Sequence, residues 1–282
     1  MRAMHPMMLL AAALLLGAPP AAAHQGPPAT GPESDTSLLA RTPALDLAAA
    51  PVALAAPLAI GGAGWGAFRR LCVTRHLIQP DGKEVLETDP SCFTATSVRQ
   101  EGAIWHLDLL SDPLRAGPRV AFATTRDAGG VVGTVAITVP ADQSAPPPAM
   151  MNRLQTVFHI MIEAHAMRRR TIEPRVRFLL PLQLSAADPD TTAEDGGFAC
   201  MPDGTAVLRG RDVLVATCRT TARTDLGDEA VARIDIAGRF AIDIETGMIL
   251  QHRYASFLFI AQDPKKKVPN LRWRGVSRQD LE

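Results

Sequence analysis

The sequence lacks every short motif that would commit it to a known catalytic mechanism. It contains no G-x-S-x-G, H-E-x-x-H or S-x-x-K pattern, so nothing indicates a serine hydrolase, a zinc peptidase or a serine–lysine enzyme. Basic and acidic residues balance at 29 each, which removes the electrostatic attraction on which nucleic-acid binding depends. We therefore expect no nucleic-acid partner, and no motif calls for a cofactor.

The N-terminus carries the pattern of a secretory signal peptide. A single charge, Arg2, precedes the apolar run 7–17, and the small residues 21–23 follow a Pro-Pro pair. This order predicts a cleaved signal over 1–23, with His24 as the mature N-terminus and a periplasmic or secreted protein. A short buried helix is the alternative interpretation.

The next segment, 24–64, is rich in alanine and proline and has no sustained periodicity. That composition predicts a flexible lead before the folded domain. Within it, 47–68 contains no charged side chain and is long enough to cross a bilayer. Pro51 and Pro57 argue against a membrane helix, but an anchor here stays open as an alternative.

Four cysteines are present, Cys72, Cys92, Cys200 and Cys218, and no two of them have the C-x-x-C spacing of zinc or redox sites. In an exported chain an even number of cysteines predicts disulfides, with three connectivities to choose among. Bridged Cα atoms must lie within about 7 Å, which neighbouring strands of one hairpin achieve most readily. We therefore expect each bridge to lie within its own half of the chain, Cys72 with Cys92 and Cys200 with Cys218. Four buried free thiols are the alternative.

Alternating apolar and polar residues separated by turn signals predict an α+β fold that is mainly antiparallel β, as a curved sheet or half-barrel, with one amphipathic helix. Pro181 in the strand 175–184 indicates a sheet edge. We expect a single β-rich domain over 65–262. It consists of two loosely similar halves, 65–139 and 171–262, joined by a helix at about 149–170. A basic tail, 263–282, follows the domain.

Three groups of residues are candidates for chemistry. His159, Glu163 and His165 follow an H-x3-E-x-H spacing on the expected helix, but only the first two share a face, so a surface hydrogen bond is favoured over a metal site. The loop 188–196 gathers four carboxylates without the spacing of a calcium loop, which favours a solvated loop. The third group alternates with isoleucines, as on a solvated sheet face, and consists of Asp235, Asp243 and Glu245.

The tail 263–282 combines cations with an aromatic ring. Trp273 lies among basic residues that include Lys265, Lys266, Lys267, Arg272, Arg274 and Arg278. Such a segment is able to contact anionic lipid headgroups peripherally. A solvated terminus is the favoured alternative.

The order of meander, helix and meander over 65 to about 261, with the hairpin 240–250, resembles uncharacterised two-half β-rich periplasmic domains of Gram-negative bacteria. More distantly it resembles carriers of the LolA and LolB type. The resemblance assigns no functional residue. The many apolar strand positions, the methionines of the expected helix and the lack of a catalytic constellation favour an exported, non-enzymatic protein that binds a lipid or other apolar ligand, or an envelope protein, on a β surface.

Two other functions stay open. One is an envelope hydrolase that assembles His106, Asp108, His159 and Glu163 in the folded chain. The other is an assembly factor that docks through the strand 175–184.

Overall fold

The structure is a computed structural model, in which some segments are not described. The described residues are 35–62, 64–66, 68–78, 83–112, 119–141, 144, 147–148, 151–152, 155, 158, 162, 166–181, 191–193, 197–227, 230–261 and 271–282. Several predictions therefore fall outside the described residues. They concern the signal peptide 1–23, the residues His159, Glu163 and His165, and most of the acidic loop 188–196.

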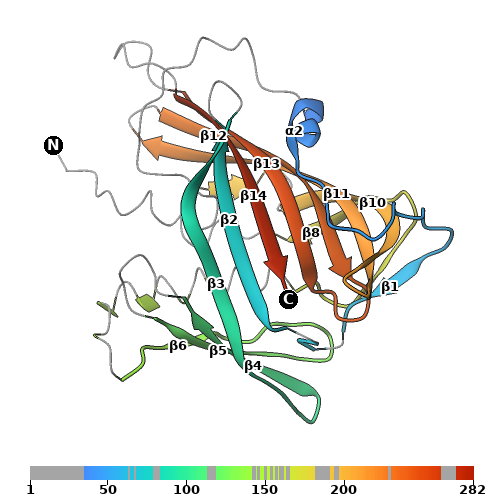
Figure 1. Ribbon diagram of the computed structural model, residues 1–282, viewed down its shortest axis with the longest axis vertical. Coiled ribbons are helices and arrows are strands. Elements are labelled where there is room, and N and C mark those ends of the chain that lie inside the picture. The colour runs from blue at the N-terminus through green and yellow to red at the C-terminus, as the bar shows by residue number, and fades with distance from the viewer. Residues whose placement is uncertain are drawn as a thin grey trace.

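One large antiparallel sheet forms most of the molecule (Figure 1). Its twelve strands follow the order β6-β5-β4-β3-β2-β14-β13-β12-β11-β10-β8, and β9 pairs with β11 beyond the end of β10. The strands are β2 Arg70–Ile78, β3 Glu84–Glu101, β4 Ile104–Ser111, β5 Ala121–Arg126, β6 Ala136–Thr138, β8 Phe178–Pro181, β9 Thr191–Ala193, β10 Gly197–Leu208, β11 Arg211–Gly227, β12 Ala230–Asp243, β13 Ile249–Ala261 and β14 Leu271–Leu281.

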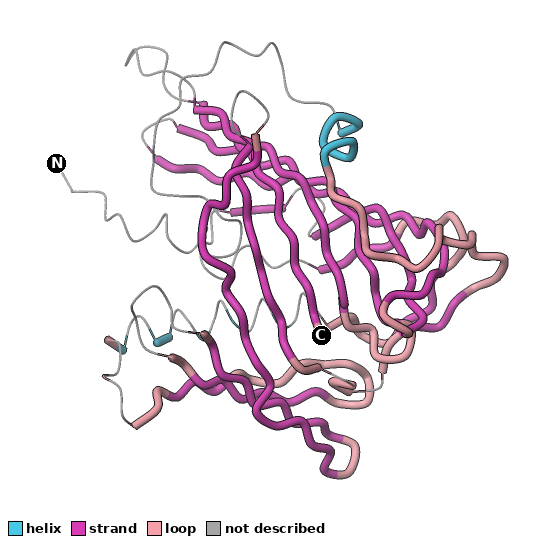
Figure 2. Tube along the Cα trace, viewed as in Figure 1, coloured by secondary structure: helices cyan, strands magenta, loops and turns pink. Residues whose placement is uncertain are grey.

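Two smaller elements complete the fold. The strands β1 Leu58–Ile60 and β7 Arg170–Ile172 form a separate antiparallel pair. The helix α2 Asp35–Arg41 lies beside β12 and β13. Figure 2 shows how strongly strand outweighs helix in the described chain. The predicted α+β class, mainly antiparallel β with one helix, is confirmed.

The sheet forms where the sequence alternates. In β5 the side chains of Ala121–Arg126 alternate strictly between half-buried and buried, as expected for a strand with one face on the core. Tight turns join neighbouring strands, and Gly102 and Gly210 at two of them have positive φ angles, which glycine adopts without a steric penalty. The predicted edge position of Pro181 is confirmed, since β8 is the last strand of the sheet.

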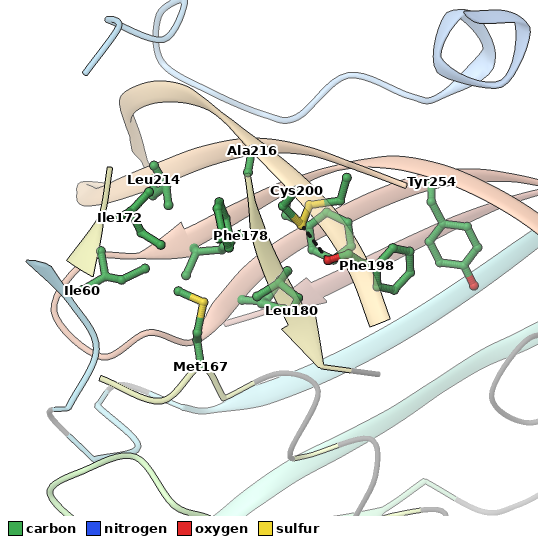
Figure 3. Packing of buried hydrophobic residues seen from close by; sticks show 14 of the residues in the cluster. Ile60, Met167, Ile172, Phe178, Leu180, Phe198, Cys200, Leu214, Ala216 and Tyr254 are labelled. Carbon is green, nitrogen blue, oxygen red and sulfur yellow. Dashed lines mark hydrogen bonds between the residues drawn. A yellow bond between two sulfur atoms is a disulfide. The ribbon is translucent and has the colours of Figure 1, made fainter. Parts of the chain in front are cut away.

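The two faces of the sheet are covered differently. Residues opposite one another in register share a face, so Phe240, His252 and Gln279 lie together. We call this side the inner face, and it carries two large apolar clusters. The opposite, outer face carries α2 and the segment that follows it. In Figure 3 the labelled cluster residues lie on the side of the sheet away from α2.

Residues 35–52, which we call the N-terminal strap, differ from the predicted flexible lead. Leu38 is buried against Ala237 and Phe257 on the outer face. Further along, Val52 and Thr205 exchange two backbone hydrogen bonds of 2.8 Å, so the strap also pairs with the edge of β10. Composition suggested disorder, but Leu45 and Leu47 pack against a second outer-face cluster, and these apolar contacts hold the segment on the sheet. Among the described residues no helix is long and apolar enough to cross a membrane.

The helix predicted at 149–170 is described only in part. Residues 148, 151, 152, 155, 158 and 162 have helical backbone, and Phe158 and Ile162 are buried in an inner-face cluster. The chain is extended by Arg170, the first residue of β7. The helix therefore ends earlier than predicted, because Ala166 already forms a β-bridge with Met248.

The predicted basic tail also differs from the structure. Its last part is β14, which pairs with β13 on one side and β2 on the other. Arg278 contacts His76 on β2 at 2.8 Å. This strand joins the two halves of the sheet. Its alternating pattern is hard to recognise in the sequence because arginines occupy several of its positions. The lysines 265–267 lie outside the described residues.

Candidate functional site

The inner face of β10, β12 and β13 carries a row of aromatic side chains. His252 stacks on Phe240 with ring centroids 3.7 Å apart, and Tyr254 lies 4.7 Å from His252. Phe198 packs edge-on against Phe240 at 5.2 Å. The four positions come together because β12 and β13 place Phe240 opposite His252 in register. Edge-on and offset ring contacts of this kind stabilise the packing beyond their buried area.

The burial of this row decreases along the strands. Phe240, His252 and Tyr254 are buried, whereas Ile234, Ser256 and Leu258 on the same face are half-buried. Ile234 pairs with Leu258 in register. The inner face therefore becomes accessible at the end of the sheet where β12 begins and β13 ends, and two apolar side chains mark the change.

A second apolar cluster occupies the inner face over β3, β4 and β5. Phe158 stacks on Phe122 with centroids 3.8 Å apart, and Phe93 lies 5.3 Å from Phe158. The cluster extends to Leu281 at the end of β14. Both halves of the sheet thus present aromatic side chains to the same side.

Arg126 links these regions from a fully buried position at the end of β5. Its guanidinium donates hydrogen bonds to the backbone oxygens of Gly64 at 2.5 Å and Met167 at 2.7 Å, and it lies 5.7 Å from the Trp65 ring centre. Burial lowers its pKa to about 10, and the nearby charge of Asp127 offsets this only in part. The side chain remains a cation at neutral pH and serves as a cross-link between three chain segments.

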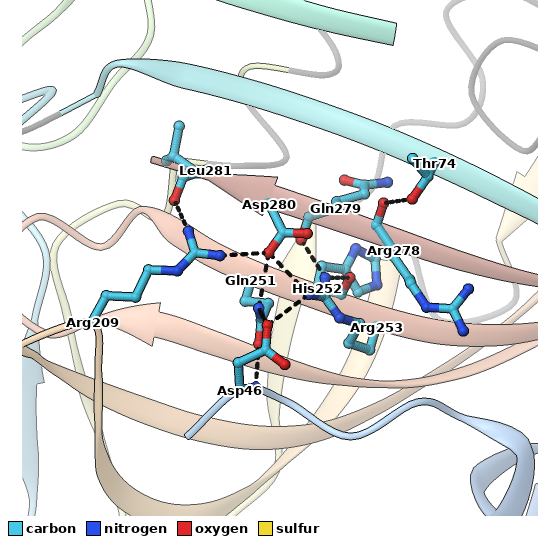
Figure 4. Close-up of polar contacts among 10 residues, drawn as sticks. All are labelled: Asp46, Thr74, Arg209, Gln251, His252, Arg253, Arg278, Gln279, Asp280 and Leu281. Atoms are coloured by element: carbon cyan, nitrogen blue, oxygen red, sulfur yellow. Dashed lines mark hydrogen bonds and ion pairs between the residues drawn. The ribbon is translucent and has the colours of Figure 1, made fainter. Parts of the chain in front are cut away.

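A polar network on the outer face fixes the N-terminal strap to the sheet (Figure 4). Asp46 accepts hydrogen bonds from Gln251 at 2.6 Å and Arg253 at 3.3 Å. Asp280 accepts from Gln251 and Arg253 at 2.8 and 2.9 Å, and from Arg209 at 3.0 Å. Burial raises the pKa of Asp280, but these hydrogen bonds and cationic charges outweigh it and lower the pKa below its usual value. All five side chains bond to at least one other member of the group, which is the pattern of a structural network.

Two of the four residues of the hydrolase hypothesis, His106 and Asp108, are described, and both lie at the surface. Asp108 pairs with Arg99 at 2.9 Å, and His106 lies 3.4 Å from Glu101. Both residues alternate with Leu107 and Leu109, which are buried in the inner-face cluster, so they lie on the outer face. The other two residues of the hypothesis, His159 and Glu163, lie outside the described residues.

The acidic residues of the second half were interpreted as a solvated face, and for two of them this was wrong. Asp235 is buried and bonds to Arg233 and Thr221. Asp243 is buried and bonds to Arg211 at 2.5 Å and to Thr246. Each carboxylate has a cationic partner, as burial of a charge demands. Only Glu245 is exposed.

Both expected disulfides, Cys72–Cys92 and Cys200–Cys218, are present. Each joins residues that face one another in neighbouring strands, β2 with β3 and β10 with β11. Two bridges with no free cysteine in the chain are typical of an oxidising compartment outside the cytoplasm.

Among the described residues no group of three or more histidines, cysteines and acids is arranged to hold a metal. The features that sequence reasoning missed are Arg126 and the pairing of Asp46 with Gln251 and Arg253. Asp46 and Gln251 are 205 positions apart in the sequence, and no local pattern indicates that they meet.

The sequence matches no known family model and no curated protein.

Proposed function

We propose that this chain is an exported, periplasmic, non-enzymatic protein that binds a lipid or other apolar ligand on the inner face of its curved sheet. The supporting observation is the aromatic row whose burial decreases toward Ile234 and Leu258. A ligand with an acyl or ring system extends this row by covering the two half-buried side chains. Binding sites for such ligands are mostly apolar with few polar groups.

The N-terminal strap already covers part of the outer face, which also favours the inner face as the ligand-binding side. The strap, which includes α2, lies over β12 and β13, and its Asp46 bonds to Gln251 of β13. The inner face ends in apolar side chains instead. The element order that resembles LolA and LolB carriers agrees with this proposal, and the disulfides agree with a periplasmic location.

Ligand binding is tested with protein isolated from the envelope fraction. Native mass spectrometry is expected to show a bound lipid, and the delipidated protein is expected to increase the fluorescence of N-phenylnaphthylamine. Leu258→Glu places a carboxylate on the apolar row and should weaken probe binding about tenfold, which corresponds to about 1.4 kcal/mol. Ile104→Glu, at an exposed hairpin end 46% accessible, is the matched control.

The proposal fails if the envelope protein carries no lipid and the delipidated form does not bind the probe. It also fails if Leu258→Glu binds the probe as tightly as the Ile104→Glu control, because the ligand then does not contact this face. Protein that begins at Met1 in the envelope fraction contradicts the cleaved signal.

A further inference from the structure

Exposed apolar side chains gather at one edge of the sheet. Of the seven large hydrophobic residues exposed in the described chain, five lie on β10, on the strap segment paired with it, or on β8 and the turn before it. The five are Val52, Val176, Leu179, Met201 and Val207. Concentration of exposed apolar area in one place marks an interaction surface more often than scattered residues do.

The strand register places two of the five, Leu179 on β8 and Met201 on β10, on the outer side of the sheet. Phe178 and Leu180 point into the inner-face cluster (Figure 3). The alternate residue, Leu179, therefore faces outward. It pairs with Ala199, so Met201, two residues further along β10, is its diagonal neighbour on the same face.

The turn that leads into β8 is strongly cationic. The ten residues 168–177 contain five arginines and one acid, Glu173, in a chain whose net charge is zero. Arg169, Arg175 and Arg177 are exposed, and no carboxylate of the described residues forms an ion pair with any of the three. Arg175 has a φ of 59°, a left-handed conformation that turns the chain back sharply.

Arg170 holds the cationic turn against β8. Its guanidinium donates a hydrogen bond to the Leu179 oxygen at 2.9 Å and lies 5.4 Å from the Phe178 ring centre. Val176, 54% exposed, lies between Arg175 and Arg177, and Leu179 is 47% exposed. Apolar side chains and guanidinium groups thus alternate over a short, fixed segment.

We propose that this surface, the turn 173–177 with Leu179 and Met201, docks on an anionic phospholipid membrane. Phosphate headgroups attract arginine and accept several hydrogen bonds from each guanidinium. Val176 and Leu179 then enter the boundary between headgroups and acyl chains, where segments with both chemistries bind. An acidic protein would pair with the arginines but leave the exposed apolar side chains without a matching environment. This inference does not depend on the proposed ligand site.

The experiment measures flotation of the purified protein with two kinds of vesicle. One contains phosphatidylcholine alone, and the other includes about 30 mole per cent phosphatidylglycerol, which supplies the negative surface potential. We expect binding to the anionic vesicles only, weakening as salt screens the attraction. Arg175→Asn with Arg177→Gln should weaken binding about 25-fold, at roughly fivefold for each charge removed. Asparagine is chosen because it tolerates a positive φ.

Matched controls remove the same groups elsewhere. Arg70→Gln with Arg99→Gln removes two surface charges, and Ile104→Ser with Val131→Ser removes two apolar side chains that are 46% and 42% exposed. Both controls should bind as the wild type does, whereas Val176→Ser with Leu179→Ser should bind several-fold more weakly. The inference is overturned if anionic vesicles are not bound or if controls and test variants weaken equally. Binding to polyglutamate without vesicle binding overturns it in favour of an acidic protein partner.

Discussion

Arg126 offers the sharpest test of how the parts of this fold are held together. Replacing it with methionine keeps most of the side-chain volume but leaves the buried oxygens of Gly64 and Met167 without donors. Each unsatisfied buried carbonyl costs about 1–3 kcal/mol. Removal of a desolvated cation offsets part of this, so we expect a net destabilisation of about 2–4 kcal/mol.

The assay is urea unfolding with the disulfides intact, followed by circular dichroism. Arg99→Met is the control, because its ion pairs with Glu101 and Asp108 are at the surface and should contribute little to stability. If Arg126→Met unfolds within about 1 kcal/mol of the Arg99 variant, the cross-link is not what joins these segments. The reasoning about buried hydrogen bonds is then refuted.

The pH dependence of the same variant has a defined sign. With a pKa near 10 in the folded protein, Arg126 is protonated in both states below that pH. The free-energy difference between wild type and variant should therefore be constant from about pH 5 to 9. Above pH 10 this arginine is more protonated in the unfolded chain than in the folded one. The free energy of unfolding of the wild type should therefore increase with pH in that range because of Arg126. A difference that changes between pH 6 and 8 contradicts the assignment.

Two further predictions concern the covalent and polar links. Replacing Cys200 and Cys218 with alanine should destabilise the protein by about 3 kcal/mol, the loop-entropy value for a bridge spanning 18 residues, and non-reducing peptide mapping of the wild type should recover no crossed pairing. Asp46→Ala should cost only about 1 kcal/mol globally, because its side chain is 65% exposed. It should nevertheless speed tryptic cleavage after Arg41, and unchanged cleavage would contradict docking of the strap through Asp46.

Most of the longer strands were predictable because they carry a period-two pattern between turn signals. The β5 segment and the Asp243–Met248 hairpin both follow local rules of alternation and turn chemistry. The cysteine pairing was predictable for the same reason, since a hairpin brings its own strands together. Local patterns also gave Pro181 its edge position.

Long-range partners were not predictable. Asp46 and Gln251 meet only because the strap crosses the outer face, and a lone aspartate in an Ala/Pro-rich segment gives no sign of this. Asp235 and Asp243 were assigned to solvent because alternation identifies a face but not what covers it. The strand β14 was missed because its cations resemble a tail until the strands on either side of it are known.

The two disulfides limit how far the halves of the sheet can be regarded as repeats. Both meanders, β2–β6 and β10–β14, join their first two strands by a bridge. Cys72 is in register with Asp280, whose side chain belongs to the outer polar network, whereas Cys200 and Cys218 lie in the inner-face cluster. Because side chains alternate between faces, superposing the two cystine pairs would exchange inner and outer faces. The halves therefore share strand order, but residues at the same distance from a cysteine face opposite sides of the sheet in the two halves. A ligand surface found on one half does not predict the equivalent surface on the other from the cysteine positions.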